Sequence, residues 1–265
     1  MKDPFESSRS PNDSGILLSF QQAERERKVE LINIISAKSI WLFDINDLNP
    51  RGKDIHSELI DWLKDNYYFD KAPSSPSDVD KDTKGLKFER GRFQIKEEIY
   101  IAVDLEIYND GIVAKSRSST HDTEKFVEDL LHLATKEFSL PVRPDMVRMK
   151  MHTSELTIHM DSVLFNLNPK LLDIANTITS ACGIPNIPLF EVADFGFSTD
   201  LAISHFKPAP FLLQRKIGAP FSEKRYYSIA PLHTEKHQEI LQEIDHILSS
   251  KSDSPKMEWT PVPTK

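Results

Sequence analysis

The sequence predicts an α+β protein built from two similar units, and three observations support this fold class. The tripeptide Thr-Glu-Lys occurs at Thr123 and again at Thr234, an offset of 111 residues (234 − 123). Each copy opens a segment whose apolar residues recur every three or four positions, the period of a helix buried on one side. Leu-Asn-Pro also occurs twice, at 48–50 and 167–169, each time between a predicted strand and a predicted helix.

Each unit is therefore expected to follow the order β-α-β-β-β-α. An antiparallel sheet would carry its helices on one face, which is a split β-α-β or ferredoxin-like arrangement. Duplication of one ancestral unit and chance recurrence of short helix-start motifs both remain open at this point, because Thr and Pro are common at helix starts.

The first unit is predicted to span 38–140. Its expected elements are a buried strand at 39–45, a helix ending near Tyr67, strands at 86–95 and 98–108, a returning strand at 112–115, and a helix beginning at Thr123. The strand at 98–108 has the clearest alternation, with Ile99, Ile101, Val103, Leu105 and Ile107 on one face. The turn Asn-Asp-Gly at 109–111 tolerates positive φ and predicts a hairpin there.

The second unit is predicted to span 145–249, with Pro141 and Pro144 marking the boundary. Its expected elements are a strand at 154–164, a helix from Leu171 to about Gly183, a strand at 189–197, a hairpin formed by 211–217 and 225–229, and a helix from Thr234. Outside the two units, residues 1–37 are predicted to form a flexible N-terminal arm in which helix and strand remain alternatives. Residues 250–265 are predicted to be a disordered tail.

Composition excludes several classes of protein. The net charge is −8, which argues against a basic nucleic-acid platform. The sequence contains no Gly-rich phosphate loop and no Gly-x-Ser-x-Gly motif, and no apolar run approaches the ~20 residues of a membrane span. Cys182 is the single cysteine, so an internal disulfide is impossible, and we expect a reducing, cytoplasmic location. The polar N-terminus does not resemble a secretory signal, and no cofactor is predicted.

Two clusters of residues are candidates for metal-dependent chemistry. Asp104 and Glu106 lie two apart on one strand face, as in a phosphodiesterase or nuclease that binds a divalent ion through carboxylate oxygens. The alternative is a solvated strand face. His233 and His237 have the i, i+4 spacing of a helical zinc site, but no third ligand is evident, so a solvated helix face is preferred. We predict no metal site.

The hairpin at 211–229 is the candidate for nucleic-acid or phosphate contact, because it interleaves basic and aromatic residues. The candidate contact residues are Arg215, Lys216, Lys224, Arg225, Tyr226 and Tyr227. An ordinary hairpin with an aromatic core side and a basic solvent side is the alternative. The acidic net charge leads us to expect only weak binding to nucleic acid.

The function predicted from the sequence is non-catalytic binding or assembly through protein–protein contacts. The partner would be another protein or a second copy of the chain, reached through a sheet edge or an exposed apolar surface. A nucleic-acid-associated protein that uses the hairpin is the first alternative. A metal-dependent phosphodiesterase that uses Asp104 and Glu106 is the second.

Overall fold

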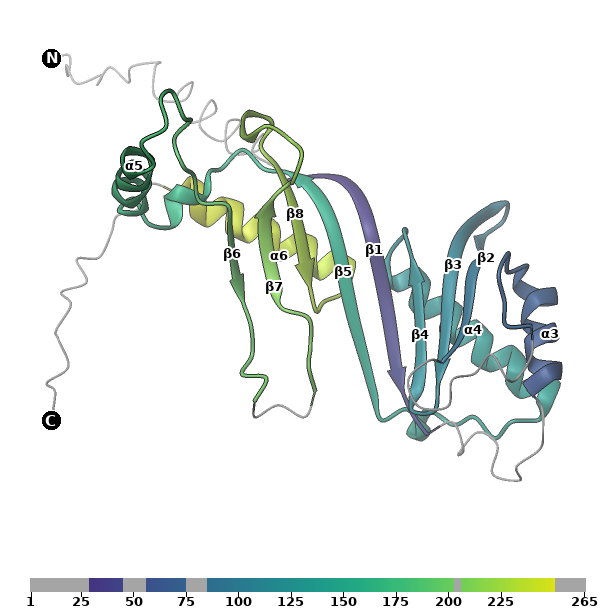
Figure 1. Ribbon diagram of the computed structural model, residues 1–265. Coiled ribbons are helices and arrows are strands. Elements are labelled where there is room, and N and C mark those ends of the chain that lie inside the picture. Colours follow the sequence, from purple (N-terminus) through teal and green to yellow (C-terminus); the bar gives the residue numbers. More distant parts are fainter. Residues whose placement is uncertain (1–28, 45–55, 75–84, 203–205, 251–265) are drawn as a thin grey trace, which may run out of the picture.

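The computed structural model describes residues 29–44, 56–74, 85–202 and 206–250, and the structural statements below concern these residues. They form an α+β fold with one antiparallel sheet of eight strands, in the order β2-β3-β4-β1-β5-β8-β7-β6 (Figure 1). The sequence predicted a separate sheet in each unit. In the structure the two sets of four strands are joined edge to edge into a single sheet.

The first half of the molecule runs from β1 to α4. Its elements are β1 (Glu30–Leu42), α3 (His56–Tyr67), β2 (Leu86–Lys96), β3 (Ile99–Tyr108), β4 (Gly111–Ser116) and α4 (Thr120–Phe138). The second half runs from β5 to α6. Its elements are β5 (Met149–His159), α5 (Leu171–Ala181), β6 (Asp194–Phe197), β7 (Phe211–Arg215), β8 (Arg225–Ala230) and α6 (Thr234–Ser249). Short 3₁₀ turns lie at Pro144–Met146, Leu164–Leu167 and Phe221–Glu223.

Both halves place their strands in the same order from the centre outward. β1 is followed by β4, β3 and β2, and β5 is followed by β8, β7 and β6. The two central strands pair antiparallel from Glu30 opposite His159 to Leu42 opposite Met149, with two register shifts. Backbone pairing of β1 with β5 is therefore what makes one sheet out of two sets of four strands.

β1 begins earlier than the predicted strand at 39–45, so residues 30–38 belong to the sheet rather than to an N-terminal arm. The sequence signal for a strand at 30–38 is weak. β1 pairs with a strand on either side, and polar residues such as Lys38 lie on one of its faces. Ala37, Ser39 and Trp41 alternate on the face that is buried. The hydroxyl of Ser39 contacts the Thr123 hydroxyl at 2.7 Å, which connects this polar position to α4.

α4 begins at Thr120, three residues before the predicted start. Ser119 is the N-cap, and its hydroxyl accepts a hydrogen bond from the Asp122 backbone N–H. Since α6 begins at Thr234, the two helix starts are 114 residues apart (234 − 120). At this offset the buried residues Thr123, Val127 and Leu131 of α4 correspond to His237, Leu241 and Asp245 of α6. The two Thr-Glu-Lys motifs therefore occupy different helical positions.

The N-termini of α4 and α6 meet under the central strands, and we call this region the junction. The Thr120 backbone N–H donates to the Thr234 hydroxyl at 3.0 Å, and the Thr234 N–H donates to the Thr120 hydroxyl at 2.9 Å. Each helix thus satisfies one free N–H of the other, which fixes the two halves against each other.

Two separate hydrophobic cores fill the space between the sheet and the helices. The first contains Phe88, Leu105 and Phe126 and includes side chains of α3, α4 and their strands. The second contains Leu156, Leu213 and Leu241 from β5, β7 and α6. Val103 and Leu105 are buried as predicted for the apolar face of β3. Ile99, at the hairpin end of the same face, is 49% exposed.

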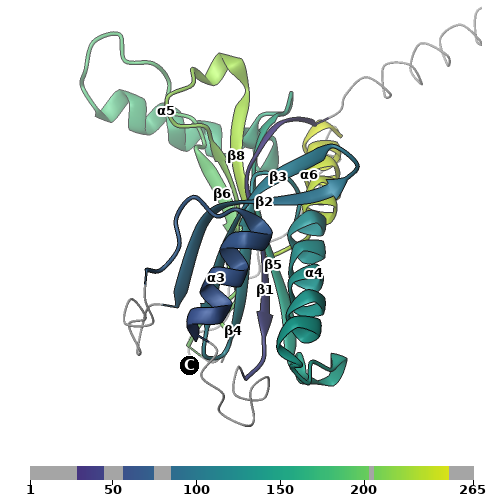
Figure 2. The same cartoon turned by 90° about the vertical axis from the view of Figure 1, so that its right-hand side faces the viewer.

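The prediction that all helices cover one face is wrong for α5. α3 and α4 share the first core, whereas α5 projects away from α4 and α6 (Figures 1 and 2). Only Ala175 of α5 is buried. β6 is also shorter than the predicted strand at 189–197, because residues 189–193 are irregular and pairing with β7 begins at Asp194.

Three predictions lie partly or wholly outside the described residues. They are the flexible character of residues 1–28, the Leu-Asn-Pro copy at 48–50, and the disordered tail from 251 onward. Within the described part of the chain, no helix combines the length and apolar character that crossing a membrane requires.

Candidate functional site

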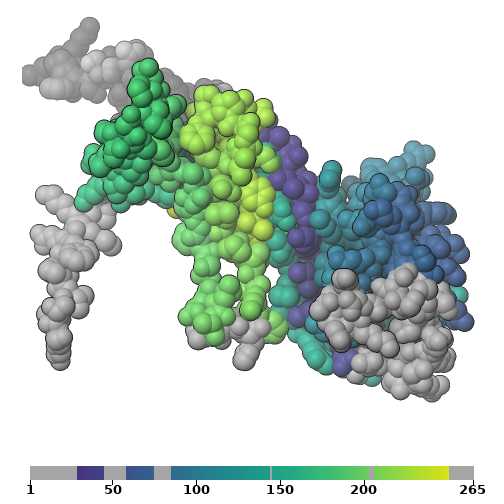
Figure 3. Space-filling view, in the orientation of Figure 1, coloured from purple at the N-terminus to yellow at the C-terminus, as the bar shows by residue number. Residues whose placement is uncertain are grey.

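Exposed apolar side chains of the second half are concentrated on α5 and the segment that follows it to residue 190. We call residues 171–190 the apolar protrusion. Six large apolar side chains in it are between 40% and 59% exposed: Leu172, Ile174, Ile178, Ile184, Leu189 and Phe190. In the space-filling view the protrusion stands off from the rest of the second half (Figure 3). A concentration of exposed apolar side chains typically marks an interaction surface.

The protrusion is a defined structure, held together by hydrogen bonds. The Phe190 backbone N–H donates to the Thr179 hydroxyl at 3.1 Å, which folds the following segment back onto α5. At its base, Glu191 accepts from the Arg215 guanidinium at 2.9 Å, so β7 anchors the chain there. The apolar side chains are therefore presented outward from an anchored base.

Next in the chain, β6 forms one edge of the sheet and carries an aromatic cluster. Phe195 and Phe197 lie on one face of β6, and Phe197 is opposite Phe211 of β7. The Phe211 ring centroid is 5.9 Å from that of His237, so this is the face that α6 covers. Phe197 is nevertheless 67% exposed. The end of the second half thus combines an open strand edge with an exposed aromatic side chain.

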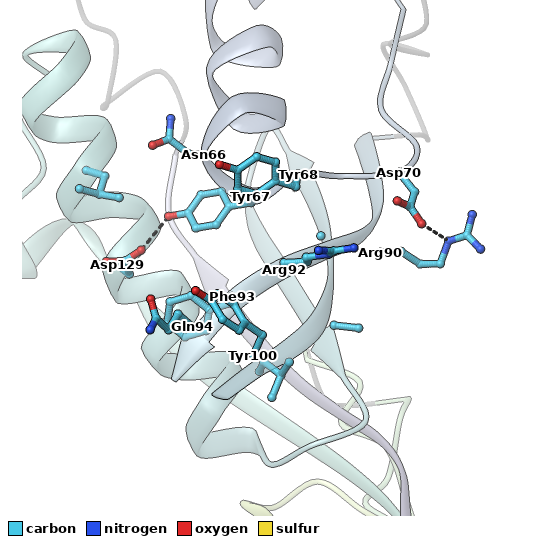
Figure 4. A pocket seen from close by; sticks show the side chains of 14 residues that line it. Asn66, Tyr67, Tyr68, Asp70, Arg90, Arg92, Phe93, Gln94, Tyr100 and Asp129 are labelled. Carbon is cyan, nitrogen blue, oxygen red and sulfur yellow. Dashed lines mark hydrogen bonds and ion pairs between the residues drawn. The ribbon is translucent and has the colours of Figure 1, made fainter. Parts of the chain in front are cut away.

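A pocket of about 950 Å³ lies in the first half, between the end of α3, the β2–β3 hairpin and α4 (Figure 4). Tyr68, Arg92 and Tyr100 are among its lining residues, and the Tyr67 hydroxyl donates to Asp129 at 2.9 Å. Burial and the neighbouring Asp129 carboxylate raise the Tyr67 pKa, so its proton stays in place. Tyrosine and arginine are typical of binding surfaces, so this pocket is a second candidate contact surface.

The candidate metal ligands Asp104 and Glu106 lie on the sheet face opposite the cores. Asp104 accepts a hydrogen bond from the Arg90 backbone N–H at 2.9 Å. Glu106 lies 3.7 Å from the Lys87 ammonium and contacts the Tyr108 hydroxyl. Among the described residues, no third histidine, cysteine or carboxylate comes close enough to complete a metal site with them. Their geometry is that of a charged, solvated strand face.

Two of the hairpin candidates, Arg215 and Tyr226, are buried. Arg215 is buried, pairs with Glu191, and packs beside the Phe221 and Tyr226 rings. Tyr226 is fully buried, and its hydroxyl donates to the Ser162 carbonyl, so its ring cannot stack on a base. The prediction that these two residues contact a ligand conflicts with their burial.

The remaining hairpin candidates have partners within the protein. Lys224 pairs with Asp161 at 3.0 Å and Arg225 pairs with Glu223 at 3.1 Å. The Tyr227 hydroxyl donates to Glu155, and the Lys216 ammonium lies 5.8 Å from the Tyr227 ring centroid. Acidic side chains therefore neutralise much of the positive charge on which the nucleic-acid hypothesis relied.

His233 and His237 do not share a solvated helix face, because His237 is fully buried. The Ser154 hydroxyl lies 2.7 Å from its Nδ1 and the Ser228 hydroxyl lies 2.8 Å from its Nε2, which occupies both ring nitrogens. Burial lowers the pKa of His237 to about 4, so the ring is neutral near pH 7. His233 is the exposed N-cap residue of α6 and is not a partner of His237 in a metal site.

At the junction, His233 belongs to a different cluster. Glu124, His152 and His233 each offer one ligand atom, and these atoms all lie within 4.8 Å of one another. Glu124 is in α4, His152 is in β5, and His233 precedes α6. This is the one group of three such ligands within the described ranges.

No protein-family model matches this sequence, and a search of curated proteins finds no relative.

Sequence reasoning missed both the apolar protrusion and the junction cluster. The apolar residues of α5 have the same helical period whether or not another element covers them. One signal was present in the segment Ile-Pro-Asn-Ile-Pro-Leu-Phe at 184–190, which is strongly apolar for a proline-containing connection. The junction cluster combines residues 124, 152 and 233, and no local pattern predicts that distant positions will meet.

Proposed function

We propose that this protein acts by protein–protein contact and assembles with a second copy of itself through the apolar protrusion. The observation that carries the proposal is the exposure of six large apolar side chains on a segment that hydrogen bonds hold in a defined form. Fully burying an exposed Leu, Ile or Phe side chain contributes about 1.5–3 kcal/mol. These six side chains are about half exposed, so covering each one would contribute roughly half of that value.

The comparison of α5 with α3 supports a second copy as the partner. α3 occupies the same place in the β-α-β-β-β-α order and buries Ile60, Leu63 and Tyr67 in the first core. α5 leaves its apolar side chains outside, and the outer strand β6 leaves Phe197 exposed. The helix and the strand face that a closed unit would pair are thus both exposed on one chain.

In the proposed assembly, α5 of one copy packs over the β6–β7 end of the other. A twofold-symmetric exchange brings each protrusion against the same patch of its partner and buries the apolar surface twice. This doubling matters because association costs roughly 4–15 kcal/mol in lost translational and rotational freedom.

The proposal is tested with the double variant Ile174→Lys, Ile178→Lys. Light scattering over a dilution series should show the unaltered chain passing from dimer to monomer, and the variant as a monomer throughout. Ile247→Lys is the matched control, because Ile247 is 57% exposed on α6 and Ile174 is 55% exposed on α5.

A strict monomer at every concentration would contradict self-association. If the same double variant then abolished capture of a different protein, the contact surface would stand and the identity of the partner would change. If neither effect occurred, the protrusion would not be the contact surface.

We also infer that the two halves are repeats of one unit. The shared strand order and the 114-residue offset between equivalent buried positions of α4 and α6 support this inference. The same offset relates Ile112, Ala114 and Ser116 of β4 to the buried residues Tyr226, Ser228 and Ala230 of β8. Superposing an experimental structure on itself at this offset should align both strand and helix, and a different best offset would contradict the repeat.

The two alternative functions have less support. Nucleic-acid binding would need the hairpin charges that acidic residues pair with, and phosphodiester cleavage would need a third ligand beside Asp104 and Glu106. Salt-dependent binding of a labelled single strand, lost in Lys216→Glu, would restore the first alternative. Cleavage that requires Mn²⁺ and Asp104 would restore the second.

A further inference from the structure

His152 carries a buried ring nitrogen without a hydrogen-bond partner. Its side chain is only 10% exposed, and its Nε2 is buried with no donor or acceptor within hydrogen-bonding distance. The Glu124 carboxylate has its Oε2 3.7 Å from that nitrogen, beyond hydrogen-bonding distance. Leaving a buried polar atom unsatisfied costs about 1–3 kcal/mol, so this position calls for a ligand.

His233 completes the cluster from the solvent side. Its ring stacks on that of His152 with the centroids 3.6 Å apart and the planes 29° from parallel. Its Nδ1 lies 3.4 Å from the Thr120 hydroxyl, and the residue is exposed. Because the Nε2 atom of His152 is buried and His233 is exposed, the cluster opens to solvent on the His233 side.

We propose that Glu124, His152 and His233 bind one divalent transition-metal ion of the Zn²⁺ type. Two imidazole nitrogens and one carboxylate oxygen suit Zn²⁺, Co²⁺ or Ni²⁺, whereas Mg²⁺ and Ca²⁺ prefer oxygen ligands. A tetrahedral ion with ligands at about 2.0–2.1 Å holds ligand atoms roughly 3.3 Å apart. The ligand atoms now lie within 4.8 Å of one another, so metal binding would draw them together by side-chain rotation. The fourth position faces solvent and is left for water.

Positive charges near the cluster should weaken the binding of a cation there. The Lys150 ammonium lies 3.1 Å from Oε1 of Glu124, the oxygen that does not face His152, and 3.6 Å from the centre of the Trp41 ring. The N-termini of α4 and α6, which also meet here, carry partial positive charge. Glu124 supplies the opposing charge. Removing the Lys150 charge should therefore tighten metal binding.

The bound ion would connect the two halves. Glu124 belongs to the first half, and His152 and His233 belong to the second. An ion that binds the folded chain more tightly than the unfolded chain raises the unfolding temperature. Metal binding would thus reinforce the junction that the reciprocal Thr120 and Thr234 hydrogen bonds already hold.

The test uses the full chain, freed of any affinity tag and stripped of metal with EDTA. Calorimetric titration with zinc sulfate should show one ion per chain, and Co²⁺ should give the visible absorption bands of a tetrahedral site. His233→Ala, an exposed substitution that leaves the core intact, and His152→Ala should each weaken binding by more than the roughly 10–100-fold typical of losing a supporting group.

His121→Ala is the matched control. His121 is an exposed histidine in the first turn of α4 and lies outside the cluster, so its loss should leave affinity unchanged. Lys150→Met should increase affinity. Zinc binding that His233→Ala does not weaken, or that His121→Ala weakens equally, would overturn the proposal, as would a wild-type chain that binds no zinc.

Discussion

The two halves of this molecule share a strand order but use their first helix in opposite ways. In the first half, Tyr67 of α3 packs edge-to-face on Phe126 of α4 at 5.0 Å, and Trp62 packs on Phe138 at 5.6 Å. In the second half, α5 has no aromatic residue in its sequence, and the residue corresponding to Phe126 at the 114-residue offset is Ile240. Aromatic pairs contribute about 0.5–1.5 kcal/mol beyond the area they bury.

This difference lies in what covers the first helix of each half. The first half covers its sheet with its own first helix, α3, which packs into the first core. The second half keeps the same sheet and α6 but leaves the apolar surface of α5 exposed. We infer that the first half supplies stability, whereas the second half supplies the contact surface.

The largest expected effect tests whether the first half is the more self-contained one. Val103 is 1% exposed in its core, and Val103→Asp places an unpaired charge there, at a cost of several kcal/mol. Hydrogen exchange should show loss of protection throughout β3 and α4. Ala102→Asp is the control, because Ala102 is the exposed neighbour on the opposite face. A Val103→Asp chain with wild-type stability would show that this face is misassigned.

A matched pair of core substitutions then compares the two cores directly. Leu105 and Leu213 are both fully buried, and each lies opposite an equivalent position of the next strand, Ala114 in β4 and Ser228 in β8. Each Leu→Ala change should lower the free energy of unfolding by about 2–5 kcal/mol. Denaturant unfolding of the two variants measures both losses. A much smaller loss at Leu213 would mean that the second core is loosely packed without its partner.

Local patterns predicted the parts of the fold that local chemistry determines. The Asn-Asp-Gly turn places β3 and β4 as neighbours, with Tyr108 opposite Gly111. The strict alternation of β3 correctly predicted that Val103 and Leu105 are buried. These features depend on residues a few positions apart, so the sequence carries them directly.

Features set by distant residues were predicted poorly. His237 was expected on a solvated helix face because no third zinc ligand was evident, but in the structure it is buried and hydrogen-bonds to Ser154, 83 positions away. Arg215 was interpreted as a phosphate contact, but Glu191, 24 positions away, pairs with it. The pairing of β1 with β5 uses backbone N–H and C=O groups, which every residue except proline provides in full. No pattern of side chains therefore predicted this pairing.

A third comparison uses pH, because the corresponding residues Thr123 of α4 and His237 of α6 differ in whether they can bind a proton. Thr123 does not titrate, whereas burial lowers the pKa of His237 to about 4. The unfolded chain binds this proton near pH 6.5, so stability is intact above that value and is lost as pH falls toward 4. The loss reaches roughly 3 kcal/mol at about 1.4 kcal/mol per pKa unit.

Chemical denaturation between pH 4 and 7, with EDTA present, measures this loss. His237→Gln keeps hydrogen-bonding capacity toward Ser154 and Ser228 but cannot titrate, so its stability should depend less on pH in this range. Other groups titrate equally in both chains, and the difference between the two curves isolates His237. Parallel curves would show that His237 is not buried in its neutral form.

The smallest expected effect distinguishes the two helix starts. The Ser119 hydroxyl caps α4 by accepting the Asp122 N–H at 3.1 Å, whereas His233 makes no side-chain capping bond to α6. Ser119→Ala should therefore destabilise the protein by about 1 kcal/mol. His233→Ala in EDTA should change stability by no more than about 0.5 kcal/mol, as for other exposed positions. Unfolding curves of both variants measure these values. Equal losses would mean that His233 supports its helix through the contact of its ring with His152, and that this stack stabilises the junction without any ion.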